Sequence, residues 1–100
     1  MREAVIVSTA RTPIGKAYRG GFNNLPSPTL AGHAISAAVA RAGIEPERIE
    51  DCIMGCALTQ GTSGGNIGRT AALRAGLPVS VSGMTVDRQC SSGMMAVAIA

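Results

Sequence analysis

The sequence predicts an α/β fold in which a mixed, mainly parallel sheet carries helices on its faces. Short β-branched apolar runs alternate along the chain with segments whose apolar residues recur at helical spacing. Nearly half of the residues are apolar (46%), and only 15% are charged. Aromatic residues are almost absent, with one Phe, one Tyr and no Trp. The core must therefore form from close contacts between aliphatic side chains and small residues.

The N-terminal part of the chain predicts a strand, a loop and a helix. Residues 3–9 (EAVIVST) are apolar at nearly every position, which is typical of a strand buried on both faces. Residues 11–24 contain a proline, several glycines and two asparagines and predict a long loop. Ser27 and Pro28 fit the N-cap and the first position of a helix. Apolar residues then recur at helical spacing until Gly43 ends the helix.

The rest of the chain predicts two more strands and two more helices. Residues 50–58 (EDCIMGCAL) form the second predicted strand, and a glycine-rich loop over residues 59–68 follows it. We expect a short helix over residues 67–75, a third strand over residues 81–86 and a third helix from Cys90 onward. This alternation predicts parallel strands, because each helix carries the chain back across the sheet.

Charge and hydropathy argue against several classes of protein. The formal net charge is +3, but the nine basic residues are scattered and form no run typical of a nucleic-acid or membrane patch. The chain also lacks the aromatic side chains on which single-stranded nucleic acids stack. No apolar run approaches the ~20 residues that a membrane span needs. We therefore expect no nucleic-acid partner and no membrane span.

Cysteine content and the N-terminus predict the compartment. Three cysteines are an odd number, and they have no disulfide-framework spacing. Residues 1–10 carry an early acidic residue and an apolar stretch of only four residues, which is too short for a signal peptide. We expect a cytoplasmic protein in a reducing compartment, and organelle import stays open.

The C-terminal residues suggest that the chain is part of a longer protein. Residues 94–100 (MMAVAIA) are apolar throughout, and no glycine, proline or basic residue ends the predicted helix. We expect these 100 residues to be the first part of a longer chain, truncated at residue 100.

Cys90 is the first candidate for chemistry. If it lies in the turn between the third strand and the third helix, free backbone N–H groups at the helix N-terminus favour its thiolate. The same groups could bind the oxyanion that forms when a thiolate attacks a carbonyl carbon. The alternative is a buried structural cysteine. The spacing alone favours this alternative, because no partner histidine is in view.

The other metal-ligating or nucleophilic side chains carry weaker signals. Cys52 and Cys56 would lie on one face of the second strand, but no second ligand pair accompanies them. We interpret them as packed core cysteines and expect no metal site. His33, the only histidine, is interpreted as a partly buried helix residue rather than a catalytic base.

Residues 63–70 (SGGNIGRT) nearly match the phosphate-binding loop of nucleotide-binding proteins. Two positions differ, since Ser63 replaces the first glycine and Arg69 replaces the lysine. A planar guanidinium is not equivalent to the lysine that reaches the terminal phosphates. Nucleotide binding is therefore a remote alternative, and a glycine-rich turn that lets another backbone come close is the favoured interpretation.

Several segments together resemble the N-terminal region of the thiolases, a family that comprises 3-ketoacyl-CoA thiolases and acetyl-CoA acetyltransferases. The matching segments are EAVIVSTARTPIG (3–15), IMG (53–55) with the loop after it, ALRAGLP (72–78) and TVDRQCSSGMMAVAIA (85–100). The resemblance runs in register over essentially the whole chain. It implies a thiolase-like fold with two similar halves, each a five-stranded mixed sheet with helices. Residues 1–100 would form most of the N-terminal thiolase domain, and the C-terminal half is absent from this chain.

The resemblance also implies an activity. Cys90 maps onto the cysteine of the family's C-[AGS]-S-G motif, the nucleophile that carries the acyl-thioester intermediate. The expected reaction is thiolytic cleavage of a 3-ketoacyl-CoA, or the reverse Claisen condensation of acetyl-CoA, and covalent catalysis divides it into two easier steps. Coenzyme A would be a substrate, so no cofactor is expected. The alternative is a thiolase-like acyl-CoA-binding or related condensing protein without thiolase turnover.

Three further expectations come from the resemblance. The histidine and second cysteine of the family's later motifs do not occur here, so we expect the 100 residues alone to be inactive. The glycine-rich loop falls where thiolases build a subunit interface, which implies a homodimer or homotetramer. Asp87 stands where many thiolases have Asn. A carboxylate that pointed toward Cys90 would disfavour its thiolate, so Asp87 is expected to face away or to pair with Arg88.

Overall fold

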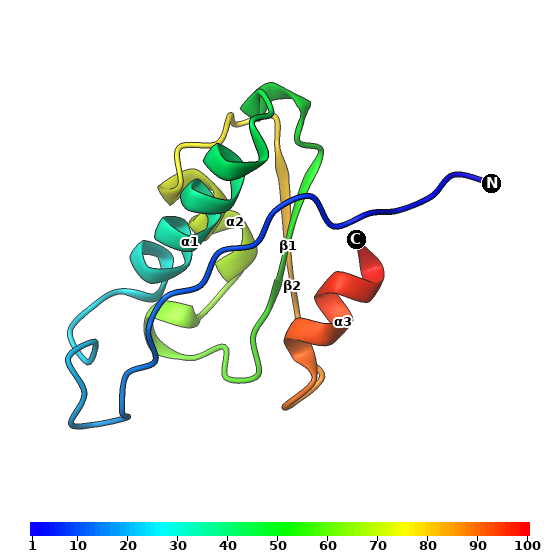
Figure 1. Ribbon diagram of the computed structural model, residues 1–100. Coiled ribbons are helices and arrows are strands. Elements are labelled where there is room, and N and C mark those ends of the chain that lie inside the picture. Colours follow the sequence, from blue (N-terminus) through cyan, green and yellow to red (C-terminus); the bar gives the residue numbers. More distant parts are fainter.

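The computed structural model describes all 100 residues and has the predicted α/β architecture. Two parallel strands, β1 and β2, form the sheet, with α1 and α2 on one side and α3 on the other (Figure 1). The elements in chain order are α1 (Ser27–Ala42), the 3-10 helix η1 (Pro46–Arg48), β1 (Asp51–Gly55), the 3-10 helix η2 (Gly61–Ser63), α2 (Ile67–Arg74), β2 (Ser82–Val86) and α3 (Ser92–Ile99). No helix is both long enough and apolar enough to cross a membrane.

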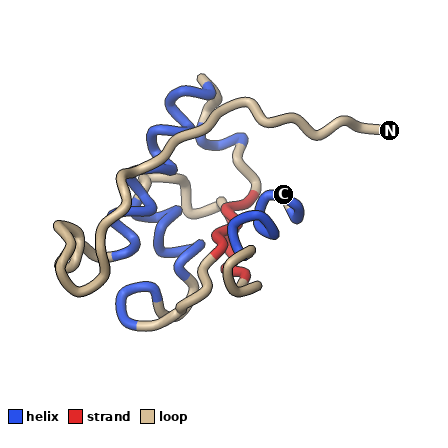
Figure 2. Tube along the Cα trace, turned by 60° about the horizontal axis from the view of Figure 1, so that its bottom comes forward, coloured by secondary structure: helices blue, strands red, loops and turns tan.

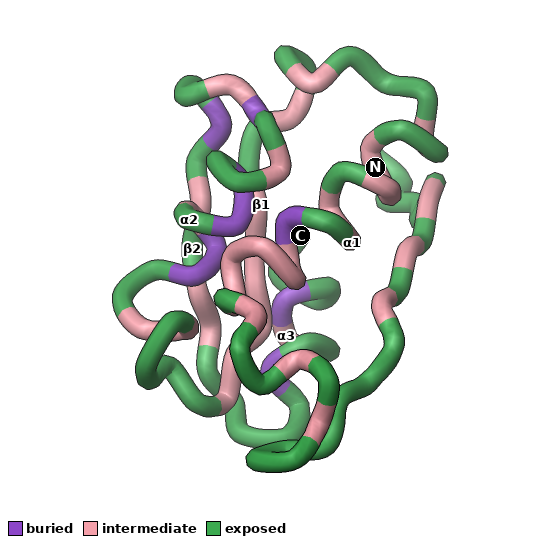
Figure 3. Tube along the Cα trace, turned by 90° about the vertical axis from the view of Figure 1, so that its left-hand side faces the viewer, coloured by how far each residue is buried: buried purple, intermediate pink, exposed green.

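The core lies between α2 and the sheet and is small. Nine residues are buried, and they concentrate in α2 and in the segment that follows it (Figure 3). Ala72, Leu77 and Val81 form the central cluster. Helix α2 approaches the strands backbone to backbone, because a Cβ on Gly68 would collide with the Met84 carbonyl group. This close approach agrees with the interpretation of the glycine-rich turn.

Local signals predict the helix ends well, with corrections at the starts of two helices. Helix α3 begins at Ser92 and not at Cys90, and the start of α1 also differs from the expectation. Helix α1 ends at Gly43, whose left-handed φ of 66° suits glycine. Its N-cap, however, is Pro26, and Ser27 is the first helical residue. The Ser27 hydroxyl instead forms hydrogen bonds with the hydroxyls of Thr62 (3.0 Å) and Ser63 (2.6 Å), which hold η2 against the start of α1.

The strand predicted over residues 3–9 is wrong. This segment is extended but unpaired, and Val5, Ile6 and Val7 are 68–77% exposed. It runs as a long loop from the N-terminus and continues past α1, where the Arg41 guanidinium donates to the Thr9 carbonyl at 2.8 Å (Figure 2). An apolar β-branched run forms a strand only where a neighbouring strand accepts and donates its backbone hydrogen bonds. No strand here does so.

We predict that Gly68→Ala destabilises the fold by about 1–3 kcal/mol, because the added methyl group must displace backbone atoms of β2. Urea denaturation, monitored by circular dichroism, measures this free energy of unfolding. Gly21→Ala is the matched control, since a Cβ there meets no atom within 4 Å and should change stability by less than about 0.5 kcal/mol. Equal effects of the two substitutions would contradict the close approach.

Candidate functional site

Cys90 lies in the turn that joins β2 to α3, two residues before the first helical residue, Ser92. The carboxyl ends of the two parallel strands meet at this edge of the sheet, and the turn projects from it (Figure 1). The side chain of Cys90 is exposed. The position agrees with the prediction from the sequence, and the alternative of a buried structural thiol does not hold for Cys90 in this chain.

Hydrogen bonds from side chains to the backbone define the turn around Cys90. The Ser92 hydroxyl accepts from the Arg88 N–H at 2.8 Å and donates to the Gln89 carbonyl at 2.6 Å. The Ser91 hydroxyl donates to the Arg88 carbonyl at 3.0 Å. Gln89 has a φ of 49°, a left-handed conformation that is uncommon for a residue other than glycine. The residue directly before Cys90 is thus held in a strained conformation.

Asp87 belongs to the same turn and does not form the ion pair considered above. Its carboxylate accepts the Gln89 N–H at 2.9 Å, so it is engaged with the backbone. The Arg88 guanidinium instead contacts the sulfur of Met95 at 3.9 Å. Of the two expected arrangements, the pair with Arg88 does not form, and Asp87 acts as a turn residue.

The start of α3 keeps free hydrogen-bond donors beside Cys90. Its N-cap residue, Ser91, makes no side-chain capping bond. The backbone N–H groups of Cys90, Gly93 and Met94 donate to no acceptor in the chain. Unsatisfied N–H groups at a helix N-terminus carry partial positive charge and stabilise an anion. This arrangement can favour a thiolate or an oxyanion.

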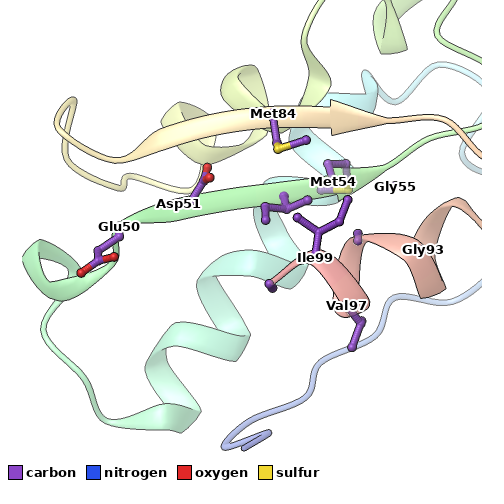
Figure 4. Close-up of a pocket in the computed structure, with 11 residues that line it drawn as sticks. Glu50, Asp51, Met54, Gly55, Met84, Gly93, Val97 and Ile99 are labelled. Atoms are coloured by element: carbon purple, nitrogen blue, oxygen red, sulfur yellow. The ribbon is translucent and has the colours of Figure 1, made fainter. Parts of the chain in front are cut away.

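The end of β1 fixes the position of α3. Gly55, the last residue of the strand, contacts the backbone of Ser92 and Gly93 so closely that a Cβ there would collide with both. Beside this contact, an open cleft of about 710 Å³ separates α3 from the strands, and Met54, Met84 and Val97 are among its lining residues (Figure 4). Cys90 does not line this cleft. The cleft is lined by no cysteine, so it is not the site of the candidate thiol chemistry.

The other two cysteines are less accessible than Cys90. Cys52 is half-buried against the core cluster. Burial, and to a smaller extent the Asp51 carboxylate, raises the pKa of the Cys52 thiol. Cys56 is also half-buried, and its thiol donates to the Leu58 carbonyl at 3.4 Å. The interpretation of Cys52 as a packed cysteine is confirmed.

The remaining ligand-type side chains do not gather into a centre. No group of three His, Cys, Asp or Glu side chains lies close enough to hold a metal ion. His33 is exposed on α1, not partly buried as expected. It lines a groove with Phe22 and Leu30, and neither Cys90 nor any other residue of its turn belongs to that groove.

The glycine-rich loop is arranged differently from a phosphate-binding loop. The Arg69 guanidinium donates to the carbonyls of Val79 and Val81, so it is committed to the protein's own backbone. The N–H groups of Ser63 and Gly64 bond to carbonyls within the loop. The guanidinium that stands in place of the phosphate-binding lysine is therefore not free to reach a phosphate, which argues against the nucleotide alternative.

Three polar residues have structural roles that the sequence analysis did not assign to them. Asn66 lies at the start of α2, and Gln89 and Ser92 lie in the turn around Cys90. Asn66 caps α2, accepting the Arg69 N–H at 3.2 Å and donating to the Gly83 carbonyl at 2.8 Å. An asparagine directly before a helix is a recognisable capping signal. The roles of Gln89 and Ser92 depend on the geometry of the turn, which the residue types alone do not indicate.

Comparisons with known proteins agree on one family. The family model described as thiolase, N-terminal domain, matches residues 4–100. An acetyl-CoA acetyltransferase of Cupriavidus necator is 47% identical over 100 residues, which are 100% of this chain and 25% of that protein. A 3-ketoacyl-CoA thiolase of Bacillus subtilis is 42% identical over 100 residues, covering 100% of this chain and 26% of that protein.

A solved structure gives the same result. The crystal structure of the Bacillus anthracis acetyl-CoA acetyltransferase superposes with a TM-score of 0.86 at 42% identity, covering 95% of this chain and 24% of that chain. The chain thus spans about a quarter of the length of the relatives it matches.

We predict that iodoacetamide alkylates Cys90 faster than Cys52 or Cys56 in the folded full-length protein. Cys90 is exposed, whereas the other two are half-buried and the pKa of Cys52 is raised. Peptide mass spectrometry after timed quenching measures the three rates. The control is the urea-denatured protein, in which the rates should converge. Equal labelling of all three cysteines in the folded protein would count against this site.

We also predict that Asp51→Asn speeds the alkylation of Cys52 at pH 8. The Asp51 carboxylate raises the pKa of this thiol, so its removal lowers the pKa and increases the thiolate fraction. Burial, the larger cause, remains, so Cys52 should stay slower than Cys90. Glu50→Gln is the control, because it removes the neighbouring carboxylate, which does not contribute to the shift. An unchanged rate in Asp51→Asn would contradict the electrostatic contribution.

Proposed function

Because the chain belongs to the thiolase family, we propose that it supplies the nucleophile, Cys90, of an enzyme that transfers acyl groups to and from coenzyme A. The observation that carries this proposal is an exposed cysteine in a strained turn, followed directly by the unsatisfied N–H groups of a helix N-terminus. The names of the relatives, acetyl-CoA acetyltransferase and 3-ketoacyl-CoA thiolase, support the same reaction class.

The proposed reaction starts with attack of the Cys90 thiolate on the 3-keto carbon of a 3-ketoacyl-CoA. The bond between carbons 2 and 3 breaks, and acetyl-CoA leaves as an enolate that takes up a proton. The shortened acyl group stays on Cys90 as a thioester. The thiolate of free coenzyme A then attacks this thioester, which releases acyl-CoA and restores Cys90. In the reverse direction, two molecules of acetyl-CoA condense.

The chain's own residues contribute the first half of this chemistry. The helix N-terminus presents partial positive charge to the attacking sulfur, and its free N–H groups can donate hydrogen bonds to the substrate oxygen as negative charge develops on it. The proton donors and acceptors would come from the family's later motifs, since the only histidine, His33, lies exposed on α1. Coenzyme A is a substrate in this scheme. A homo-oligomer that uses the glycine-rich loop remains part of the proposal.

We predict that Cys90→Ala abolishes thiolysis of acetoacetyl-CoA by the full-length protein, lowering kcat by about 10⁴-fold or more, as expected when a covalent nucleophile is removed. The disappearance of the 3-ketoacyl-CoA absorbance measures the rate. Wild-type protein incubated with acetyl-CoA and quenched in acid should carry an acetyl group on the Cys90 peptide, and acetyl-CoA should protect Cys90 from iodoacetamide.

Cys56→Ala is the control and should keep substantial activity, because Cys56 is half-buried and bonds to its own loop. Acetylation of Cys52 or Cys56 instead of Cys90 would contradict the assignment of Cys90 as the nucleophile. An acetylated Cys90 in a protein that never completes thiolysis would favour the acyl-CoA-binding alternative.

A further inference from the structure

Ser92 is the only buried residue with a polar side chain, at 4% exposure. It is the first residue of α3, and its hydroxyl forms no bond within its own helix. The hydroxyl instead reaches back past Cys90 to the other side of the turn, where it accepts the Arg88 N–H and donates to the Gln89 carbonyl. The two bonds close a loop that contains Cys90.

The carbonyl that Ser92 holds belongs to the strained residue. Gln89 is one of two non-glycine residues with positive φ in the chain. Its carbonyl accepts both the hydroxyl and the backbone N–H of Ser92, at 2.6 and 3.1 Å, and its N–H is held by Asp87. A left-handed residue of this kind relaxes unless its surroundings fix it. Ser92 supplies two of the three bonds that do so.

We propose that Ser92 is a positioning residue for Cys90. Its hydroxyl keeps Gln89 left-handed and thereby presents the following residue, Cys90, at the start of α3 beside the free N–H groups of Gly93 and Met94. This inference rests on the proposed nucleophilic role of Cys90. Because Ser92 is buried, it acts through the turn and not by contact with the substrate.

A purely structural role for Ser92 would have different consequences. A hydroxyl that only stabilised α3 would, when removed, lower the melting temperature and leave the chemistry at Cys90 intact in the folded protein. A positioning hydroxyl changes the rate of acyl transfer to Cys90. Restoring the backbone conformation of Gln89 by another route should then restore that rate.

The test compares four variants of the full-length protein: Ser92→Ala, Ser80→Ala as the control, Gln89→Val and the double variant Ser92→Ala/Gln89→Gly. The readouts are the rate of Cys90 acetylation by acetyl-CoA, the alkylation rate of Cys90 by iodoacetamide, kcat and KM for acetoacetyl-CoA, and the melting temperature. Ser92→Ala should lower the acetylation rate and kcat by about 10–100-fold with KM changed little, the size expected for misplacement of a reacting group.

The other variants distinguish an effect on the conformation of the turn from an effect on the stability of α3. Ser80→Ala removes an exposed hydroxyl that lies outside the turn and should change the rates by less than about threefold. Gln89→Val leaves Ser92 intact but disfavours the left-handed conformation, so it should also slow acetylation. In the double variant, glycine adopts positive φ without strain and should recover at least about tenfold of the lost rate.

Each result either supports or overturns the positioning role of Ser92. Slow acetylation in Ser92→Ala and in Gln89→Val, with recovery in the double variant, supports the positioning role. A Ser92→Ala protein that loses melting temperature but acetylates at the wild-type rate overturns it, as does loss of rate without recovery in the double variant. If Ser92→Ala fails to fold, Gln89→Val decides alone, and a wild-type acetylation rate there overturns the proposal.

Failure of the proposed function would look different. In that case the wild-type protein itself forms no acetylated Cys90. The alkylation rates then decide the positioning role. A changed Cys90 rate in Ser92→Ala that returns in the double variant supports control of this thiol by Ser92, and an unchanged rate refutes it.

Discussion

The parallel pairing of β1 and β2 is the constraint on which the rest of the site depends. The register aligns Gly55, the last residue of β1, with Val86, the last residue of β2. One further hydrogen bond, from the Cys56 N–H to the Val86 carbonyl at 3.0 Å, continues the pairing beyond the strands. Both strands therefore end at one edge, where the chain leaves β2, turns through Cys90 and enters α3. A shift of this register would move the turn away from the strand end that supports it.

Glycine residues let the backbones of the helices contact the backbones of the two strands directly. On one face Gly68 of α2 and Gly83 of β2 bring the two backbones together, and on the other Gly55 contacts the first turn of α3. The chain has few large side chains to fill a wide gap, so contact between main chains replaces aromatic packing. Asn66, the N-cap residue of α2, completes the junction by accepting a 2.8 Å hydrogen bond from the hydroxyl of Thr85 in β2. Fold stability and the position of Cys90 therefore depend on the same close contacts.

The features that could be predicted from the sequence are those fixed locally. Gly43 ends α1 because the left-handed conformation required there favours glycine. The turn at Cys90 was placed correctly because apolar strand and helix patterns flank it. The prediction of a strand at residues 3–9 is wrong because a strand needs a neighbouring strand to pair with, and an apolar run does not specify one. The importance of Ser92 also escaped prediction, since one buried hydroxyl gains its role only from the strained backbone three residues before it.

The magnitude of the helix effect limits what this chain can do by itself. A helix N-terminus stabilises an exposed anion by about 0.3–1 kcal/mol, which is less than a tenfold change in an equilibrium constant. Donors directed at a developing oxyanion in a site that excludes water contribute more, about 2.7–4 kcal/mol each. Cys90, Gly93 and Met94 are all exposed in this chain, so water screens their interactions. The proposed acyl transfer therefore requires further protein surface over the start of α3, which excludes water and lets the same N–H groups act at full strength.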